Sequence, residues 1–228
     1  MNLFLRLKKQ HGLRSVRCKG QRLRYRELKN TEIVPRFLAH WEKHAHHEWP
    51  TQPWYSGIGL HYHKDCKIQP LTKQLCGNDG RDDYHDTISY DLEIFPGLLA
   101  QFGPFTSVRS KITCMSVKSD NHSLASSNGW HRDETPFEAL RVVIPLSSNC
   151  TYQFQIDNAA PIAMIPGNAY AFDQSQYHRV FSTGPSNVNR IHLVLSFVTW
   201  FDKIGEEWIP NQFFNKVHPL DLFDLVDL

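Results

Sequence analysis

From residue 106 onward, short apolar or alternating segments follow one another at close intervals, separated by turn residues. Such segments predict β-strands, because successive side chains of a strand point to opposite faces. Seven strands are expected, over residues 107–116, 141–146, 151–156, 161–165, 169–173, 178–182 and 190–199. Short strands at this spacing favour a mainly β fold, an antiparallel double-stranded β-helix or cupin-type jelly roll.

The first hundred residues predict fewer strands and two helices. Residues 12–28 indicate one or two short strands, because polar and apolar residues alternate within them. Residues 31–44 predict a helix with a proline in its first turn. Residues 67–88 are polar and rich in Gly, Asn and Asp, which indicates a loop, and residues 90–102 predict a helix that is broken or restarted near Pro96 and Gly97. We expect the helices to pack on one sheet.

Length and composition favour one domain. With 228 residues and 41% hydrophobic content, the chain can bury one sizeable core. We expect a single domain over residues 1–228, with N-terminal strands and helices in 1–105, a jelly-roll core in 106–200 and a C-terminal extension in 201–228. No run of about eighteen apolar residues occurs, so no membrane association is expected.

The formal net charge of +2 conceals a basic N-terminus. Residues 1–30 hold ten of the twenty-five Lys and Arg residues and a single acid, Glu27. Such an arm is typical of a polyanion-binding segment or a transit peptide. The alternation of arginines with Leu23 and Tyr25 instead favours a half-solvated strand, so we expect no nucleic-acid partner.

The cysteines and the first residues bear on the cellular compartment. The chain start lacks a long apolar segment followed by a small-residue cleavage site, so secretion is not expected. The five cysteines are odd in number, scattered and without a CxxC pair: Cys18, Cys66, Cys76, Cys114 and Cys150. This pattern favours reduced thiols in the cytoplasm over a disulfide framework or a zinc site.

His131 and Asp133 form the first part of a candidate metal site. Residues two apart in an extended segment project to the same side, so this imidazole and this carboxylate can reach one ion. His63 and Asp65 have the same spacing, which shows how easily the motif arises by chance. Only the first pair is followed by a series of strands that ends in another histidine and an arginine, so we interpret His63 as structural.

His178 is the candidate third ligand. It follows a turn, an alternating strand and a polar loop over residues 166–177, and it precedes the last predicted strand. Two imidazoles and one carboxylate on one face of Fe(II) leave positions open for an α-keto acid and O₂. We therefore predict that His131, Asp133 and His178 bind Fe(II) and form the catalytic centre of an oxygenase.

Arg190 and Arg141 are candidate anion-binding residues. In the strand that begins at Arg190 the odd positions are apolar, which places Arg190 and His192 together on the other face. A guanidinium inside a barrel requires an anion, and it binds a carboxylate through two nitrogens. We expect this anion to be the distal carboxylate of 2-oxoglutarate, with a structural ion pair as the alternative. Arg141 points either to a cosubstrate or substrate carboxylate, or outward to a surface acid.

Four segments within residues 106–200 are similar to the aspartyl/asparaginyl β-hydroxylase family of Fe(II)/2-oxoglutarate-dependent oxygenases: 130–133, 140–146, 172–180 and 190–195. The resemblance implies that His131 and His178 bind iron, that Arg190 binds 2-oxoglutarate and that Arg141 contributes to this site. Animal members lack a carboxylate ligand, so Asp133 brings the chain closer to bacterial free amino-acid hydroxylases of the family.

One further departure concerns the cosubstrate. Val143 stands where the β-hydroxylases carry a histidine that helps to bind 2-oxoglutarate, and His192 is the candidate replacement. The resemblance implies hydroxylation of an amino acid, an amino-acid-derived metabolite or a peptidyl side chain, with release of succinate and CO₂. Candidate substrate contacts are Trp130, Arg132 and Glu134.

Several alternatives stay open at this point. Desaturation and cyclisation use the same ligand set as hydroxylation. A cupin-type oxygenase that works without 2-oxoglutarate would not require Arg190 to face the metal. A jelly-roll binding module without catalytic activity would use the same residues as a polar core. The pattern does not decide the oligomeric state.

Overall fold

The computed structural model describes residues 3–44, 55–62, 94–115, 128–147, 152–182 and 190–228. The predicted loop over residues 67–88 and the second His-x-Asp pair, His63 and Asp65, lie outside these residues. Among the described residues, no helix is both long and apolar enough to cross a bilayer.

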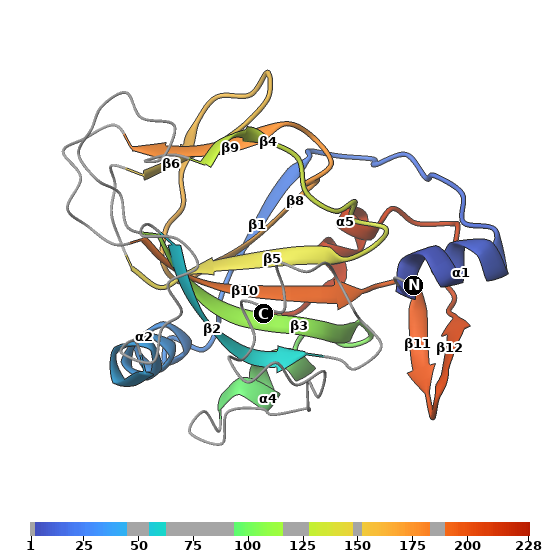
Figure 1. Ribbon diagram of the computed structural model, residues 1–228, viewed down its shortest axis with the longest axis horizontal. Helices are drawn as coiled ribbons and strands as arrows, with labels where there is room; N and C mark the ends of the chain where they lie inside the picture. The colour runs from blue at the N-terminus through green and yellow to red at the C-terminus, as the bar shows by residue number, and fades with distance from the viewer. Residues whose placement is uncertain (1–2, 45–54, 63–93, 116–127, 148–151, 183–189) are drawn as a thin grey trace.

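Two antiparallel sheets form the body of the molecule and lie one above the other in Figure 1. The larger sheet contains, in spatial order, β1 (Leu23–Glu27), β8 (Asn168–Phe172), β5 (Leu140–Pro145), β10 (Arg190–Val198), β3 (Thr106–Met115) and β2 (Tyr55–Tyr62). The smaller sheet contains β4 (Asn128–His131), β9 (His178–Ser182), β6 (Tyr152–Ile156) and β7 (Ile162–Ala163). This arrangement confirms the predicted mainly β, double-stranded β-helix fold.

All seven predicted strands of the C-terminal half are present, although β7 has only two residues. The segment 12–28 contains one strand, β1. Four strands were not predicted: β2, β4, and the two strands β11 (Phe201–Ile204) and β12 (Glu207–Pro210), which form a hairpin. β4 was missed because its four residues, Asn-Gly-Trp-His, have no apolar alternation; pairing with β9 makes it a strand.

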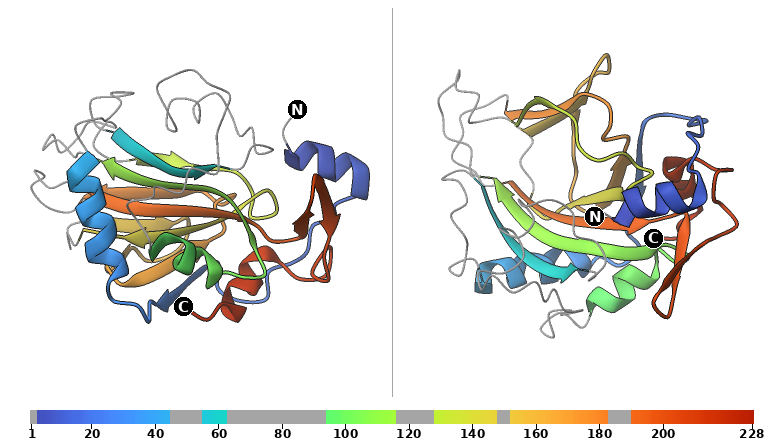
Figure 2. Two further views of the ribbon diagram at one scale, coloured as in Figure 1. Left: turned by 90° about the horizontal axis from the view of Figure 1, so that it is seen from below. Right: turned by 45° about the vertical axis from the view of Figure 1, so that its right-hand side comes forward.

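Helices cover the outer face of the larger sheet, as predicted (Figure 2). The predicted helix at 31–44 is α2 (Ile33–His44), and a second helix is α4 (Ile94–Ala100). Of the helix predicted over residues 90–102, the structure describes α4, and Pro96 lies in its first turn, where a backbone N–H has no intrahelical partner to lose. A short N-terminal helix, α1 (Leu3–His11), was not predicted.

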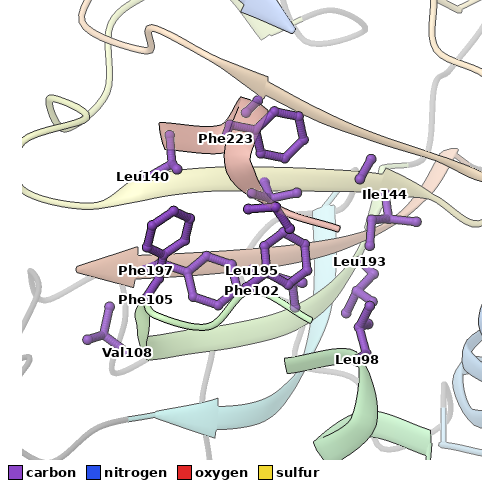
Figure 3. Packing of buried hydrophobic residues seen from close by; sticks show 14 of the residues in the cluster. Leu98, Phe102, Phe105, Val108, Leu140, Ile144, Leu193, Leu195, Phe197 and Phe223 are labelled. Atoms are coloured by element: carbon purple, nitrogen blue, oxygen red, sulfur yellow. The ribbon is translucent and has the colours of Figure 1, made fainter. Parts of the chain in front are cut away.

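The main hydrophobic core lies between the larger sheet and these helices. The odd residues of β10 belong to it, as the alternation predicted: Ile191, Leu193, Leu195 and Phe197. Phe197 stacks on Phe102 with ring centroids 4.6 Å apart (Figure 3). A second, smaller cluster lines the space inside the jelly roll: Val143, Tyr152, Phe154, Ile156, Phe172 and Val180. β10 is therefore buried on both faces, which positions its even residues for the site.

The basic N-terminal strand is held by acidic residues near the C-terminus. Arg24 forms ion pairs with Asp221, at 2.5 Å, and with Asp224. The side chain of Arg26 donates to the backbone carbonyl of Asp224 at 2.8 Å. Lys29 pairs with Asp227. We call this set of contacts the terminal clasp; it compensates part of the positive charge of the N-terminus within the chain.

Replacing Arg24 with alanine is expected to destabilise the fold by about 3 kcal/mol, because it leaves the largely buried carboxylate of Asp221 without its cation. Chemical denaturation of the two proteins measures this change. Lys29→Ala is the control, since Lys29 pairs with Asp227 at the surface, where such pairs contribute little. Equal unfolding midpoints for Arg24→Ala and the wild type would contradict the structural role of the clasp.

A buried histidine caps the C-terminal helix α5 (Pro219–Leu222). The Nδ1 atom of His218 accepts a hydrogen bond from the backbone N–H of Leu220 at 3.1 Å. The ring also lies edge-on to Phe137, with centroids 4.9 Å apart. Burial lowers the pKa of His218 below its usual value, and this effect outweighs the opposite influence of Asp173 and Asp221. His218 is neutral in the folded protein because only the neutral ring can accept this bond.

The free energy of unfolding is expected to decrease as the pH is lowered below about 6.5, which is the pKa of a histidine in an unfolded chain. Below that value the unfolded chain binds a proton at His218 more readily than the folded chain does, since folding lowers the pKa. The free energy of unfolding, measured from pH 8 to pH 5, should therefore decrease less in His218→Asn, which keeps a capping acceptor that does not titrate. Identical pH profiles for both proteins would contradict this contribution.

Candidate metal centre

Two strands of the smaller sheet place the three predicted ligands. His131 is the last residue of β4 and His178 is the first residue of β9, and the two lie directly opposite each other in the antiparallel pairing. Asp133 follows β4, and its backbone N–H donates to the carbonyl of Gln174 at 2.9 Å. The loop before β9 thereby holds Asp133 beside the two histidines.

The side chains of His131, Asp133 and His178 converge. Each offers one ligand atom, and these atoms all lie within 4.8 Å of one another. The Oδ2 atom of Asp133 is 4.0 Å from Nε2 of His131 and 3.6 Å from Nε2 of His178. Two imidazole nitrogens and one carboxylate oxygen suit Fe(II) and leave coordination positions for other ligands. The structure therefore contains a site that can hold a metal ion, composed of the three residues that the sequence predicts.

Backbone carbonyls orient both histidine rings. Nδ1 of His131 donates to the carbonyl of Gly129 at 2.7 Å, and Nδ1 of His178 donates to the carbonyl of Gln176 at 2.9 Å. A carbonyl can only accept, so Nδ1 carries the proton in both rings and Nε2 keeps its lone pair. Metal-binding histidines are commonly oriented by such a bond. Both lone pairs face the carboxylate of Asp133.

The site is buried on one side and open on the other. His178 is only 3% exposed and packs against Phe172 and Phe154, with ring centroids 5.1 and 5.9 Å away. The side chains of His131 and Asp133 are 34% and 27% exposed. A small molecule therefore reaches the site from the side of His131 and Asp133.

The carboxylate of Asp133 is held in its charged form. Burial alone would raise its pKa, but the Arg141 guanidinium, 2.5 Å away, lowers the pKa far below the usual range. Asp133 is therefore ionised at neutral pH, which is the form that binds a metal ion.

Glu134 connects two arginines of the larger sheet. Its Oε2 atom accepts from Arg141 and its Oε1 atom accepts from Arg109, each at 2.7 Å. Burial opposes ionisation, but these two arginines lower the pKa of Glu134 to about 2. Arg109 was not among the predicted site residues. The available signal was a charged residue in the middle of a predicted strand, but Lys111 of the same strand carries the same signal.

Arg190 and His192 line a small pocket inside the jelly roll. The other lining residues are Ser147, Tyr152, Gln153, Phe154, Met164 and Val180. Burial and the charge of Arg190 lower the pKa of His192 well below its usual value, so the ring is neutral. Val180 follows His178 by two residues on the same strand, which places the pocket beside the candidate metal site. The pocket combines a cation and hydroxyl groups with apolar walls.

Arg141 does not line this pocket. It pairs across the larger sheet with Ser196, whereas His192 pairs with Pro145 at the other end of β5. Its observed partners are Asp133 and Glu134. Of the two orientations expected for Arg141, the structure thus shows an arginine paired with acids, but these acids belong to the site. A contact of Arg141 with 2-oxoglutarate stays a prediction.

Trp130 and Arg132 are two candidate substrate contacts that flank His131, Trp130 within β4 and Arg132 directly after it. The guanidinium of Arg132 lies 4.0 Å from the ring centre of Tyr177. Arg179 lies 4.7 Å from the ring centre of Trp130. Their role in substrate binding stays a prediction.

Comparisons with known proteins show likeness of fold. No family model and no curated protein matches the chain. Among solved structures, it is similar to SnoN, a non-haem alpha-ketoglutarate-dependent epimerase from nogalamycin biosynthesis, with 10% identity over 92% of this chain and 93% of that chain, and a TM-score of 0.50. This similarity, over nearly the whole length of both chains, supports the assignment of the fold to the double-stranded β-helix.

Two further structures are similar at lower TM-scores. A prolyl hydroxylase from Trichoplax adhaerens, solved with a peptide fragment of hypoxia-inducible factor, has 10% identity over 86% of this chain and 87% of that chain (TM-score 0.47). An oxidoreductase of the 2OG-Fe(II) oxygenase family from Burkholderia pseudomallei has 14% identity over 80% of this chain and 92% of that chain (TM-score 0.42).

Proposed function

We propose that this protein is an Fe(II)- and 2-oxoglutarate-dependent oxygenase. The observation that carries the proposal is the convergence of His131, Asp133 and His178 beside a pocket that contains Arg190. The fold shared with SnoN is compatible with it. His131, Asp133 and His178 would hold the metal, which when bound supplies the activation of O₂ that couples decarboxylation of 2-oxoglutarate to oxidation of a C–H bond.

The pocket residues suit 2-oxoglutarate. The guanidinium of Arg190 binds the distal carboxylate through two nitrogens, the geometry for which it is suited. The neutral ring of His192 supplies one further donor that adds no charge. Phe154 and Met164 provide apolar contacts to the methylene groups and exclude water.

For the substrate, we propose an amino acid, an amino-acid-derived metabolite or a peptidyl side chain, with hydroxylation as the reaction. The support is the resemblance of residues 130–133, 140–146, 172–180 and 190–195 to the aspartyl/asparaginyl β-hydroxylases. Asp133 supports a relation to the free amino-acid hydroxylases within that family. The reducing cytoplasm that we expect from the cysteine pattern would keep iron in its Fe(II) form.

The proposal is tested by titrating the protein with Fe(II) and then with 2-oxoglutarate under anaerobic conditions. A panel of amino acids and peptides follows, with succinate release as the measurement. We expect binding of one Fe(II) and one 2-oxoglutarate per chain, and succinate formation that a substrate stimulates. Binding of iron without 2-oxoglutarate would favour a cupin-type oxygenase, and binding of neither would favour a binding module.

A further inference from the structure

A series of four alternating charges extends from the candidate metal site into the larger sheet. Arg141 donates to Oδ2 of Asp133 at 2.5 Å and to Oε2 of Glu134 at 2.7 Å. Arg109 donates to Oε1 of Glu134 at 2.7 Å and to the hydroxyl of Ser196 at 3.3 Å. We call these four charged residues, Asp133, Arg141, Glu134 and Arg109, the ion-pair network. Its first member is a predicted metal ligand and its last is anchored on β10.

The pairing of the strands fixes the spacing of the two arginines. Ser196 of β10 lies opposite Arg109 of β3 on one side and opposite Arg141 of β5 on the other. The two arginines are therefore two strand spacings apart, about 10 Å between backbones. Glu134 spans this gap by giving one carboxylate oxygen to each guanidinium. The rigid sheet thereby sets the position of Arg141.

Burial makes these contacts strong. The side chain of Arg109 is 7% exposed, and those of Arg141 and Glu134 are also largely buried. Removing one member of such a group leaves a charge without its partner in a poorly solvated place. Each guanidinium and the Glu134 carboxylate make two contacts, so no member can rotate away without losing one.

We propose that Arg141 is a positioning residue that holds the Asp133 carboxylate toward His131 and His178, and that Glu134 and Arg109 fix Arg141 in this place. The inference rests on the proposed function, because the task assigned to Asp133 is metal binding. It gives Arg141 a role other than contact with the cosubstrate, whose proposed pocket is lined by other residues.

The shape of the guanidinium explains why an arginine stands here. Arg141 uses Nη1 for Asp133 and Nη2 for Glu134. A lysine ammonium carries the same charge but is a single point on a flexible stem, so it cannot reproduce the planar fork. Arg141→Lys therefore keeps the charge and removes the bridge between the two carboxylates.

Metal binding by Arg141→Lys and Glu134→Gln tests the proposal without turnover. Co(II) is the probe, with affinity measured by anaerobic calorimetry and coordination by visible absorption. We expect about 10- to 100-fold weaker Co(II) binding in both variants, as for other residues that orient metal ligands, and a changed absorption spectrum. Glu134→Gln leaves the contact between Arg141 and Asp133 possible, so its loss should be the smaller one.

Arg24→Lys is the matched control. Arg24 also bridges two carboxylates, those of Asp221 and Asp224, but it lies in the terminal clasp. The same substitution there should lower the midpoint of thermal unfolding and leave the Co(II) affinity and spectrum unchanged. This comparison separates a loss of stability from a loss of ligand positioning.

The outcomes distinguish the positioning role of Arg141 from the proposed function. If the wild type binds Co(II) and both variants bind it equally tightly with the same spectrum, the positioning role is overturned and the proposed function stands. If the wild type binds no Co(II) or Fe(II), the proposed function fails and the positioning role fails with it. If Arg141→Lys does not fold, Glu134→Gln decides. Weaker Co(II) binding by this variant supports the positioning role of the ion-pair network, and unchanged binding overturns it.

Discussion

Asp133→Ala should abolish the formation of succinate from 2-oxoglutarate. The substitution removes the single anionic ligand of the candidate site and leaves the Arg141 guanidinium beside the position of a divalent cation. Both changes weaken metal binding, which we expect to decrease by more than about 100-fold, beyond the effect of altering a residue that only orients a ligand. Anaerobic Fe(II) titration and a succinate assay at saturating 2-oxoglutarate measure the two effects.

Asp157→Ala provides the control for this experiment. Asp157 is an exposed aspartate that directly follows β6, and the same substitution there should leave iron binding and succinate formation unchanged. Full activity of Asp133→Ala would show that Asp133 is not a ligand. The two histidines would then have to hold the metal without a carboxylate.

Arg190→Met should raise the KM for 2-oxoglutarate by about 10- to 100-fold, because a hydrogen bond to a charged group contributes about 1.5–3 kcal/mol. Methionine retains much of the apolar volume and removes the cation that faces the pocket. The neutral state of His192 means that the ring cannot replace this charge. Because the metal ligands stay in place, we expect Fe(II) affinity to change little.

The control is Arg179→Met, on the outer face of β9, where the guanidinium lies against Trp130 and Phe181. It should leave the KM for 2-oxoglutarate unaltered. An unchanged KM in Arg190→Met would place the cosubstrate carboxylate elsewhere, and Arg141 would become the next candidate. Steady-state kinetics with varied 2-oxoglutarate at a fixed Fe(II) concentration measures the KM of both variants.

The alternation of side chains was sufficient to predict seven strands of the two sheets and the faces of β10. In β10 the odd residues enter the main core and the even residues Arg190 and His192 enter the inner pocket, as a period of two requires. The start of α4 could not be predicted, because the effect of a proline depends on where the helix begins, and the pattern left a break and a restart near Pro96 equally open.

The candidate metal ligands could be predicted from the sequence because their spacing and their order along the chain carry information. The partners of Arg141 could not be predicted in this way. Alternation assigns a residue to a face, but the neighbours across that face depend on strand order, and β5, β10 and β3 are adjacent in space without being consecutive in the chain. Arg109 and Glu134 could therefore be connected to Asp133 only after the sheet was known.

If the proposed site binds a metal ion, the direct opposition of His131 and His178 in the pairing of β4 with β9 makes the metal affinity depend on the register of the two strands. A slip of β4 by one residue would turn His131 outward and bring Trp130 or Arg132 to the inner face. Such a protein would keep both sheets and its overall secondary structure, yet it would lose the ion. Metal binding therefore distinguishes the native alignment of these two strands from a misaligned form that circular dichroism would not detect.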